Sequence, residues 1–283
     1  TASPCPATAH AMRPTSDHAG FTLIEMIIVI AITAIVGSMV AVFLRAPLES
    51  YVAQDRRARL ADAADTALRR MGRDIRLALP NSVRVTTDAA GVVYLEFLGT
   101  RSGGRYRAQG GGDILDFTVS DTGFDVLGPG IDMKAGDLIA VYNLGITGAD
   151  AWAGNTLAAY AGAPGNVTHI AITSKQFPLA SPGNRFQVVD GPVTYVCAPN
   201  PANPALGTLT RYWGYAIAAA KPTPPAPPAP ASSALLATNV SACSFTYQPG
   251  ATERGGLVSM TLDLSQAGET VRLYATTQVS NQP

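Results

Sequence analysis

The first marked pattern along the chain is an apolar run from Phe21 to Leu44, FTLIEMIIVIAITAIVGSMVAVFL, in which Glu25 is the only charged residue. As a helix, this run would extend about 36 Å at 1.5 Å per residue, which is enough to cross a bilayer core of about 30 Å. Arg45 ends the run. The pattern therefore predicts a membrane-spanning helix over residues 21–45.

From residue 49 to residue 79 the apolar positions recur at helical spacing and form a single stripe. The stripe consists of Leu60, Ala64, Ala67, Leu68, Met71, Ile75 and Leu79. Charged residues cover the remaining surface, and Asp55–Arg59 and Asp65–Arg69 have the spacing of favourable i,i+4 pairs. We predict an amphipathic helix over residues 46–80 that continues the membrane segment. Its stripe must be buried against a sheet or against neighbouring copies.

Two prolines bear on this long helix. Pro47 lacks a backbone donor and is expected to kink or loosen the helix where the apolar run ends. Pro80 is expected to stop the helix.

After Pro80 the period changes from helical spacing to alternation, as in residues 257–264, where Val258, Met260, Leu262 and Leu264 point to one face. The expected strands are 82–86, 92–98, 114–119, 137–144, 168–173, 186–196, 208–217, 242–248, 257–264 and 270–279. Loops are expected at Gly103-Gly104, at 110–112, over 145–166 with a helical turn, and in the Pro-rich stretch 221–234. The predicted fold class is α+β, a long N-terminal helix packed on a predominantly antiparallel head over residues 81–283.

Composition removes several classes of function. The chain has 20 Lys and Arg against 20 Asp and Glu, so it has no cationic excess for nucleic acid. No G-x-S-x-G or H-E-x-x-H motif is present, and the surroundings of His169 are those of an ordinary strand. We therefore expect no catalytic residue and no cofactor. The sequence leaves open a loop calcium site at Asp113, Asp116, Asp121 and Asp125, and sugar stacking on Tyr212, Trp213 and Tyr215.

The hexapeptide GFTLIE at residues 20–25, followed by some twenty apolar residues and preceded by a short polar leader, resembles the class III signal of type IV pilins and pseudopilins. The resemblance implies a leader over residues 1–20, cut between Gly20 and Phe21 by a prepilin peptidase, and N-methylation of Phe21. Translation is expected to start at Met12, with residues 1–11 upstream of the start.

Glu25 is the assembly residue that this resemblance implies. A carboxylate at the bilayer centre costs about 2.5–3.5 kcal/mol, so an acidic residue there needs a partner. Glu25 lies four residues after Phe21, roughly 6 Å along a helix, so it could instead reach the interface. The functional hypothesis is that Glu25 neutralises the amine of Phe21 in a neighbouring subunit.

The three cysteines fit the same processing event. Loss of the leader would remove Cys5 and leave Cys197 and Cys243, a pair that suits a disulfide in an oxidising compartment. Two unrelated buried thiols are the alternative.

Several later segments resemble minor pilin-like proteins of the mannose-sensitive haemagglutinin (MSHA) pilus system, of the MshO type. They are residues 62–85, 209–217, 235–250, 254–265 and 279–283. The resemblance implies an inner-membrane, single-pass subunit with a periplasmic head, which joins other major and minor pilins through the inner-membrane assembly platform and helps initiate a pilus at its tip. The alternatives are a J-type minor pseudopilin of type II secretion and a filament-tip adhesin. A tethered enzyme is a third class, but it lacks a clustered site.

Overall fold

The computed structural model describes residues 20–220, 231–250 and 255–283. The chain divides into two units, one ending at Ala53 and a compact one spanning Gln54–Pro283. The fold is α+β, as predicted, with one long N-terminal helix and a head rich in antiparallel sheet.

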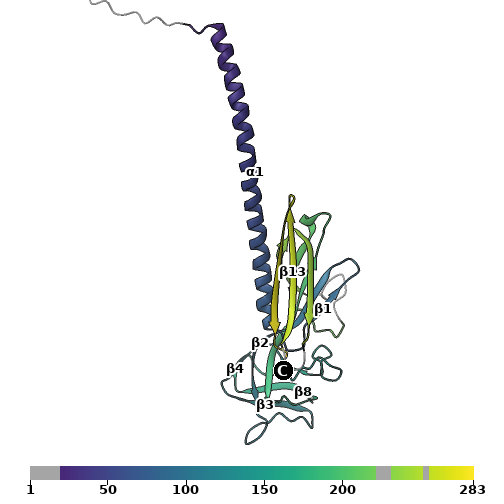
Figure 1. Ribbon diagram of the computed structural model, residues 1–283. Helices are drawn as coiled ribbons and strands as arrows, with labels where there is room; N and C mark the ends of the chain where they lie inside the picture. The colour runs from purple at the N-terminus through teal and green to yellow at the C-terminus, as the bar shows by residue number, and fades with distance from the viewer. Residues whose placement is uncertain (1–19, 221–230, 251–254) are drawn as a thin grey trace, which may run out of the picture. The chain divides into compact units, whose positions relative to one another are not determined.

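Helix α1 spans Leu23–Arg76, 54 residues, and continues through Pro47 (Figure 1). It ends four residues before Pro80. There, Leu77 N–H donates to Asp74 C=O and Ala78 N–H to Ile75 C=O, which are the i→i+3 bonds of a tightened last turn. Ala78 then forms an antiparallel bridge with Gly99. The helix therefore ends by joining the sheet, before the proline is reached.

Nine strands form the larger sheet, in the order β11-β10-β9-β2-β3-β8, with β1 beside β2 and β5 between β9 and β6. These strands are β1 (Arg84–Thr87), β2 (Val93–Tyr106), β3 (Asp121–Leu127), β5 (Leu138–Val141), β6 (Leu157–Ala159), β8 (His169–Lys175), β9 (Arg185–Ala198), β10 (Thr208–Trp213) and β11 (Ser232–Thr238). Strands β12 (Val240–Gln248), β13 (Gly256–Gln266) and β14 (Glu269–Val279) form a second sheet. Strands β4 (Ile131–Met133) and β7 (Gly165–Val167) form a third, and η1 (Pro204–Leu206) is a single 3₁₀ turn.

The loop expected at Gly103-Gly104 is wrong, because both glycines lie inside β2 and pair with β9. A Cβ at Gly103 would stand 2.7 Å from the carbonyl oxygen of Phe186, and one at Gly104 would stand 3.1 Å from its ring. The glycines therefore permit a close approach of two strands, which is the other common role of glycine in a sheet.

The strand expected over 114–119 is also wrong. Two backbone N–H groups there donate to aspartate side chains: Asp116 N–H to Asp121 Oδ2 at 2.8 Å and Thr118 N–H to Asp116 Oδ1 at 2.7 Å. Leu115 N–H donates to the Arg107 carbonyl at 2.9 Å, a single backbone bond outside any strand. Such local bonds compete with a sheet ladder. The strand of this region is β3, which begins at Asp121.

Three strands lie where loops were expected. Strand β6 falls within 145–166, which has turns and no helix, β7 begins inside that stretch, and β11 begins inside the stretch 221–234. Residues 221–230 of that stretch lie outside the described residues.

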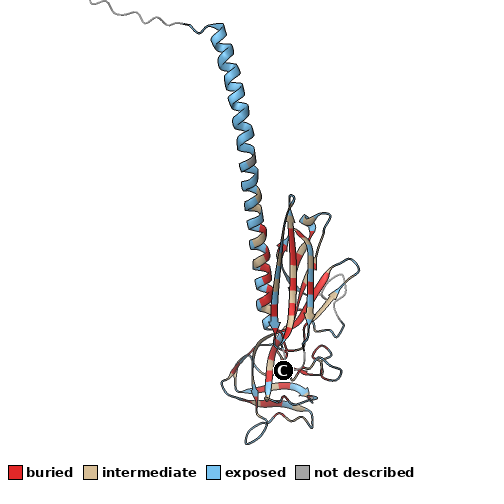
Figure 2. Cartoon of the chain, in the orientation of Figure 1, coloured by how far each residue is buried: buried red, intermediate tan, exposed pale blue. Residues whose placement is uncertain are grey.

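The main core lies where the second half of α1 meets both large sheets. All seven residues of the predicted stripe are buried. Most of them pack with inward side chains such as Phe97, Tyr195 and Met260, while Leu79 joins a smaller cluster with Leu98 and Trp152. Figure 2 shows burial on the second half of α1 and along β13. The alternation predicted for 257–264 is confirmed, since Val258, Met260, Leu262 and Leu264 are all buried.

A disulfide between Cys197 on β9 and Cys243 on β12 joins the two large sheets, with 6.6 Å between the Cα atoms. The bond closes a loop with a sequence separation of 46 residues. On chain-entropy grounds a loop of this length contributes about 4 kcal/mol to the stability of the head.

Candidate functional site

The first turn of α1 carries the processing motif. Gly20 and Phe21 precede the helix, and the Phe21 side chain is 76% exposed. Thr22 caps the helix, because its Oγ1 accepts a hydrogen bond from the Glu25 backbone N–H at 3.3 Å. Residues Thr22 and Glu25 therefore have the spacing of a capping box, T-x-x-E, with only the threonine half formed among the described residues. The sequence-based prediction lacks this cap, although the T-x-x-E spacing is visible in the sequence.

The next twenty residues present apolar side chains outward on every face of the helix. Its most apolar 18-residue window has a mean hydropathy of 2.8, and none of that window is buried within the chain (Figure 2). Met39 is 67% exposed and Phe43 85% exposed. An apolar surface of this extent is not tolerated in water, so it must contact lipid or other chains.

The hydroxyl side chains within this apolar segment are satisfied by the helix itself. Thr33 Oγ1 donates to the Val29 carbonyl at 2.7 Å, and Ser38 Oγ donates to the Ile35 carbonyl at 2.7 Å. Since an unsatisfied polar group in hydrocarbon costs several kcal/mol, these bonds lower the cost of burying the two hydroxyl groups in a membrane.

The second half of α1 is fastened to the head by Asp74. Its Oδ2 accepts hydrogen bonds from Tyr195 Oη at 2.8 Å and from Arg211 Nε at 2.7 Å, which ties the last turns to β9 and β10. Burial, and then the nearby Asp74 carboxylate, raise the pKa of Tyr195 well above its ordinary value. The sequence pattern placed Asp74 among the solvated charges, which is wrong because the side chain is largely buried.

A second buried carboxylate, Glu96 on β2, organises the adjoining part of the sheet. Glu96 pairs with Arg84, and its Oε1 accepts a hydrogen bond from Tyr215 Oη at 2.9 Å. Arg84 also donates to the carbonyl oxygens of residues 218–220 at 3.0 Å each, and its guanidinium lies 3.6 Å from the ring centroid of Trp152. Burial, and then the charge of Glu96, raise the pKa of Tyr215 strongly. These contacts fix the chain where it leaves the sheet before the Pro-rich stretch.

The aspartates considered for calcium are engaged within the protein. Asp125 Oδ2 accepts from the Asp113 N–H at 3.0 Å, and Asp125 Oδ1 lies 3.2 Å from His169 Nδ1. The bond from Asp113, followed by the one to His169, lowers the pKa of Asp125. Within the described ranges, no three His, Cys, Asp or Glu side chains are grouped closely enough to hold a metal ion.

The three aromatic residues considered for sugar stacking are not gathered on an open face. Tyr215 is buried against Glu96, and Trp213 packs at the edge of the main core, with the Arg211 guanidinium 4.7 Å from its ring centroid. Tyr212 lies on the same strand as Trp213 and is partly exposed.

Residues 15–41 match the family model described as the prokaryotic N-terminal methylation motif. No curated protein matches the chain. No solved structure matches it either.

The motif supports a type IV pilin-like or pseudopilin subunit, a structural class of protein and not an enzyme class. It implies processing by a prepilin peptidase and partners of the pilin type. Together with the single apolar helix found in the described residues, it supports single-pass anchoring in a membrane.

Proposed function

We propose that this chain is a non-enzymatic minor pilin-like subunit, cut between Gly20 and Phe21 and methylated on Phe21. The observation that carries the proposal is the division of α1: the half behind the processing motif is apolar and wholly exposed, and the other half is in the core of the head. Such a helix holds the subunit in the inner membrane before assembly, with its head in the periplasm. The same apolar half then packs among neighbouring helices in a filament.

Within this class, we assign the chain to the initiation of an MSHA-type pilus, at or near its tip. The support is the set of MshO-type segments, residues 62–85, 209–217, 235–250, 254–265 and 279–283. Deletion of the gene is expected to abolish or strongly reduce surface pili while leaving protein secretion intact. Loss of secretion with normal pili would instead assign the chain to a type II secretion system.

Glu25 is proposed to neutralise the Phe21 amine of a neighbouring subunit, a role separable from its place in the capped first turn. Glu25→Gln keeps the backbone bond to Thr22 but removes the charge. We expect this variant to be cleaved normally and to enter filaments at least tenfold less efficiently. Incorporation is measured by immunoblotting sheared filaments against the membrane fraction.

Thr22→Ala is the matched control for Glu25→Gln. It removes the cap, which costs about 1 kcal/mol of helix stability, and leaves the carboxylate in place. This variant is expected to be incorporated at near wild-type levels. Equal incorporation of Glu25→Gln and wild-type protein would contradict the charge role.

A further inference from the structure

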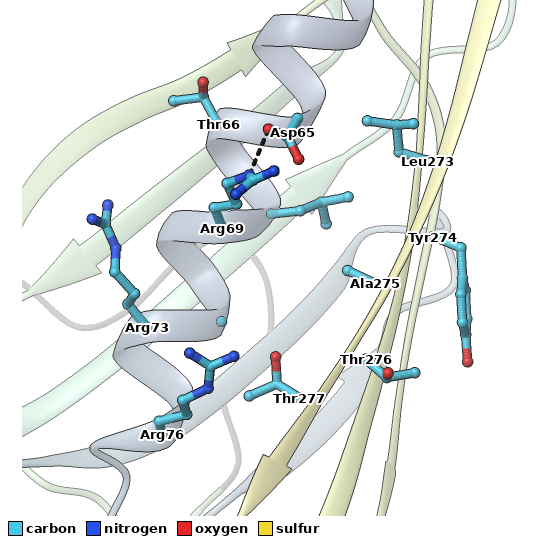
Figure 3. Close-up of a pocket in the computed structure, with 12 residues that line it drawn as sticks. Asp65, Thr66, Arg69, Arg73, Arg76, Leu273, Tyr274, Ala275, Thr276 and Thr277 are labelled. Atoms are coloured by element: carbon cyan, nitrogen blue, oxygen red, sulfur yellow. Dashed lines mark hydrogen bonds and ion pairs between the residues drawn. The ribbon is translucent and has the colours of Figure 1, made fainter.

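A groove of about 570 Å³ lies between the second half of α1 and strand β14 (Figure 3). One wall is helical and carries Asp65, Arg69, Arg73 and Arg76, with Gly72 at the base. The other wall is a run of five consecutive strand residues, 273–277. Both walls belong to the unit Gln54–Pro283.

The strand wall is the free edge of a sheet. Strand β14 is the last strand in the order β12-β13-β14, so among the described residues it pairs on one side only, with β13. Successive side chains of a strand point to opposite faces, and in Figure 3 Tyr274 points away from the helix. A groove that touches five consecutive residues therefore meets the edge of the strand, where backbone N–H and C=O groups lack a ladder partner.

The helix wall carries an excess of positive charge. Arg69 Nε is bonded to Asp65 Oδ2 at 2.6 Å. In the described part of the chain, Arg73 and Arg76 form no ion pair and no hydrogen bond, and both are exposed. The groove thus has three arginines against one aspartate, next to an open strand edge.

The helix and the β13–β14 hairpin are held together beside the groove and within it. Beside the groove, Arg57 Nε pairs with Glu269 Oε2 at 3.0 Å, and Arg56 donates to the Ala267 carbonyl at 3.3 Å. Within its lining, a Cβ on Gly72 would stand 2.9 Å from Thr277 Oγ1, so the helix approaches the strand closely there. The groove is therefore formed before any partner arrives.

The charge of the helix wall and the open edge of β14 together select an extended segment that carries carboxylates. Alternate side chains of a strand point to the same face and repeat at about 6.6–6.8 Å. A strand added to β14 would thus present alternate Asp or Glu side chains on the face of the sheet that the helix covers, where carboxylates form charge-assisted pairs with guanidinium groups.

The Pro-rich stretch of this chain is a poor occupant. Residues 221–230 read KPTPPAPPAP, with one lysine, no carboxylate and six prolines, which have no N–H to donate to a ladder. We therefore take the occupant to be a segment of another chain.

We infer that this groove binds an extended, acidic segment of a neighbouring subunit, which adds a fourth strand at β14 while its carboxylates pair with Arg73 and Arg76. The inference rests on the proposed function only in taking the partner to be another filament subunit.

The test uses the full chain in detergent and a labelled peptide, acetyl-Thr-Glu-Val-Glu-Val-Glu-Thr-amide, with binding followed by fluorescence anisotropy. Two matched peptides separate charge from backbone pairing: one has Lys in place of Glu, and the other is N-methylated at every peptide bond. The acidic peptide is expected to bind at least tenfold more tightly than either. Equal binding of the N-methylated peptide, or no preference for Glu over Lys, would overturn the inference.

Protein variants locate the site. Arg73→Glu combined with Arg76→Glu is expected to weaken peptide binding at least tenfold, whereas Arg70→Glu, on an exposed arginine of the same helix outside the groove, should not change it. Tryptophan fluorescence checks that each variant is folded. If the double variant binds the acidic peptide as tightly as Arg70→Glu does, the site assigned to the groove is ruled out.

This test is independent of the proposed function. If the acidic peptide does not bind to a chain that carries N-methylated Phe21, the groove inference is wrong and the proposed function stands. If the peptide binds to a chain that is never processed, the proposed function is wrong and the groove inference stands.

Discussion

Single side chains determine how the helix meets the head. Asp74 and Glu96 are carboxylates with little exposure, and each accepts a hydrogen bond from a buried tyrosine and pairs with an arginine. Removing one member of such a cluster leaves a buried charge without its partner. The stability lost in this way is greater than the net contribution of the intact pair to stability. These clusters are therefore expected to matter more for stability than the exposed pairs Asp55–Arg59 and Asp65–Arg69, both of which were predicted and are formed.

Tyr195 and Tyr215, the buried tyrosines of these two clusters, give the head a defined response to alkaline pH. Their pKa values are raised by burial and by the nearby carboxylates, whereas an unfolded tyrosine titrates near pH 10. Below pH 10 both states keep the proton and stability is unaffected. Above it only the unfolded state loses the proton, so we expect each tyrosine to lower the free energy of unfolding by about 1.4 kcal/mol per pH unit.

Urea unfolding between pH 8 and pH 11 measures this effect. Tyr195→Phe combined with Tyr215→Phe should make the alkaline decline shallower, and Tyr274→Phe, on a side chain that is 66% exposed, should leave it unchanged. An unchanged decline in the double variant would show that other groups cause it.

For single residues, the sequence predicts the positions of charged side chains along the helix better than it predicts the residues with which they pair. The stripe and the i,i+4 pairs follow from spacing along one helix, which the sequence contains directly. Both partners of Asp74, Tyr195 and Arg211, lie more than 100 residues away in the chain, as does Tyr215, which donates to Glu96. No local pattern indicates these partners.

One element, α1, has two environments. Met39 is 67% exposed and Met71 is fully buried, although both lie on the same helix. Met71→Ala is expected to destabilise the head by about 2–5 kcal/mol, since it leaves a cavity in the main core. Met39→Ala should leave the stability of the head unchanged.

Tryptophan fluorescence during urea unfolding of the full chain in detergent compares the two methionine variants, because both tryptophans, Trp152 and Trp213, lie in the head. Equal midpoints for both variants would contradict the division of the helix into an outward half and a core half.

The strands that could be predicted are those with clear alternation and branched or aromatic residues, such as β2, β9 and β13. Strand β6, with the sequence Leu-Ala-Ala, and strand β7, Gly-Asn-Val, lack that composition. The stretch 114–119 alternates well but forms no strand, because aspartate side chains accept hydrogen bonds from two of its backbone N–H groups. Strands β6 and β7 form because they pair with other strands, whereas 114–119 forms no strand because of local side-chain hydrogen bonds.

For the whole molecule, the boundary of the folded head lies within the helix. The compact unit begins at Gln54, so it contains most of the segment 46–80 that the sequence predicts as an amphipathic helix continuing into the head, together with the residues 81–283. A chain that begins at residue 54 is expected to fold into a soluble unit. A chain that begins at residue 81 lacks the entire buried stripe of α1 and should expose the inner faces of both large sheets.

Binding of a hydrophobic dye and near-ultraviolet circular dichroism distinguish the two truncated chains. Dye binding with weak near-ultraviolet signal is expected only for the chain that begins at residue 81. A well-folded product from that chain would show that the helix is not part of the core.

The central claim, that the chain is processed for assembly like a pilin, is tested most directly by the N-terminus of the mature protein. The chain is expressed in cells that have a prepilin peptidase, extracted from the membrane and analysed by tandem mass spectrometry of its N-terminal peptide. The account predicts a peptide beginning with N-methylated Phe21. A mature chain that still carries residues before Phe21, or an unmethylated N-terminus at another position, would contradict it.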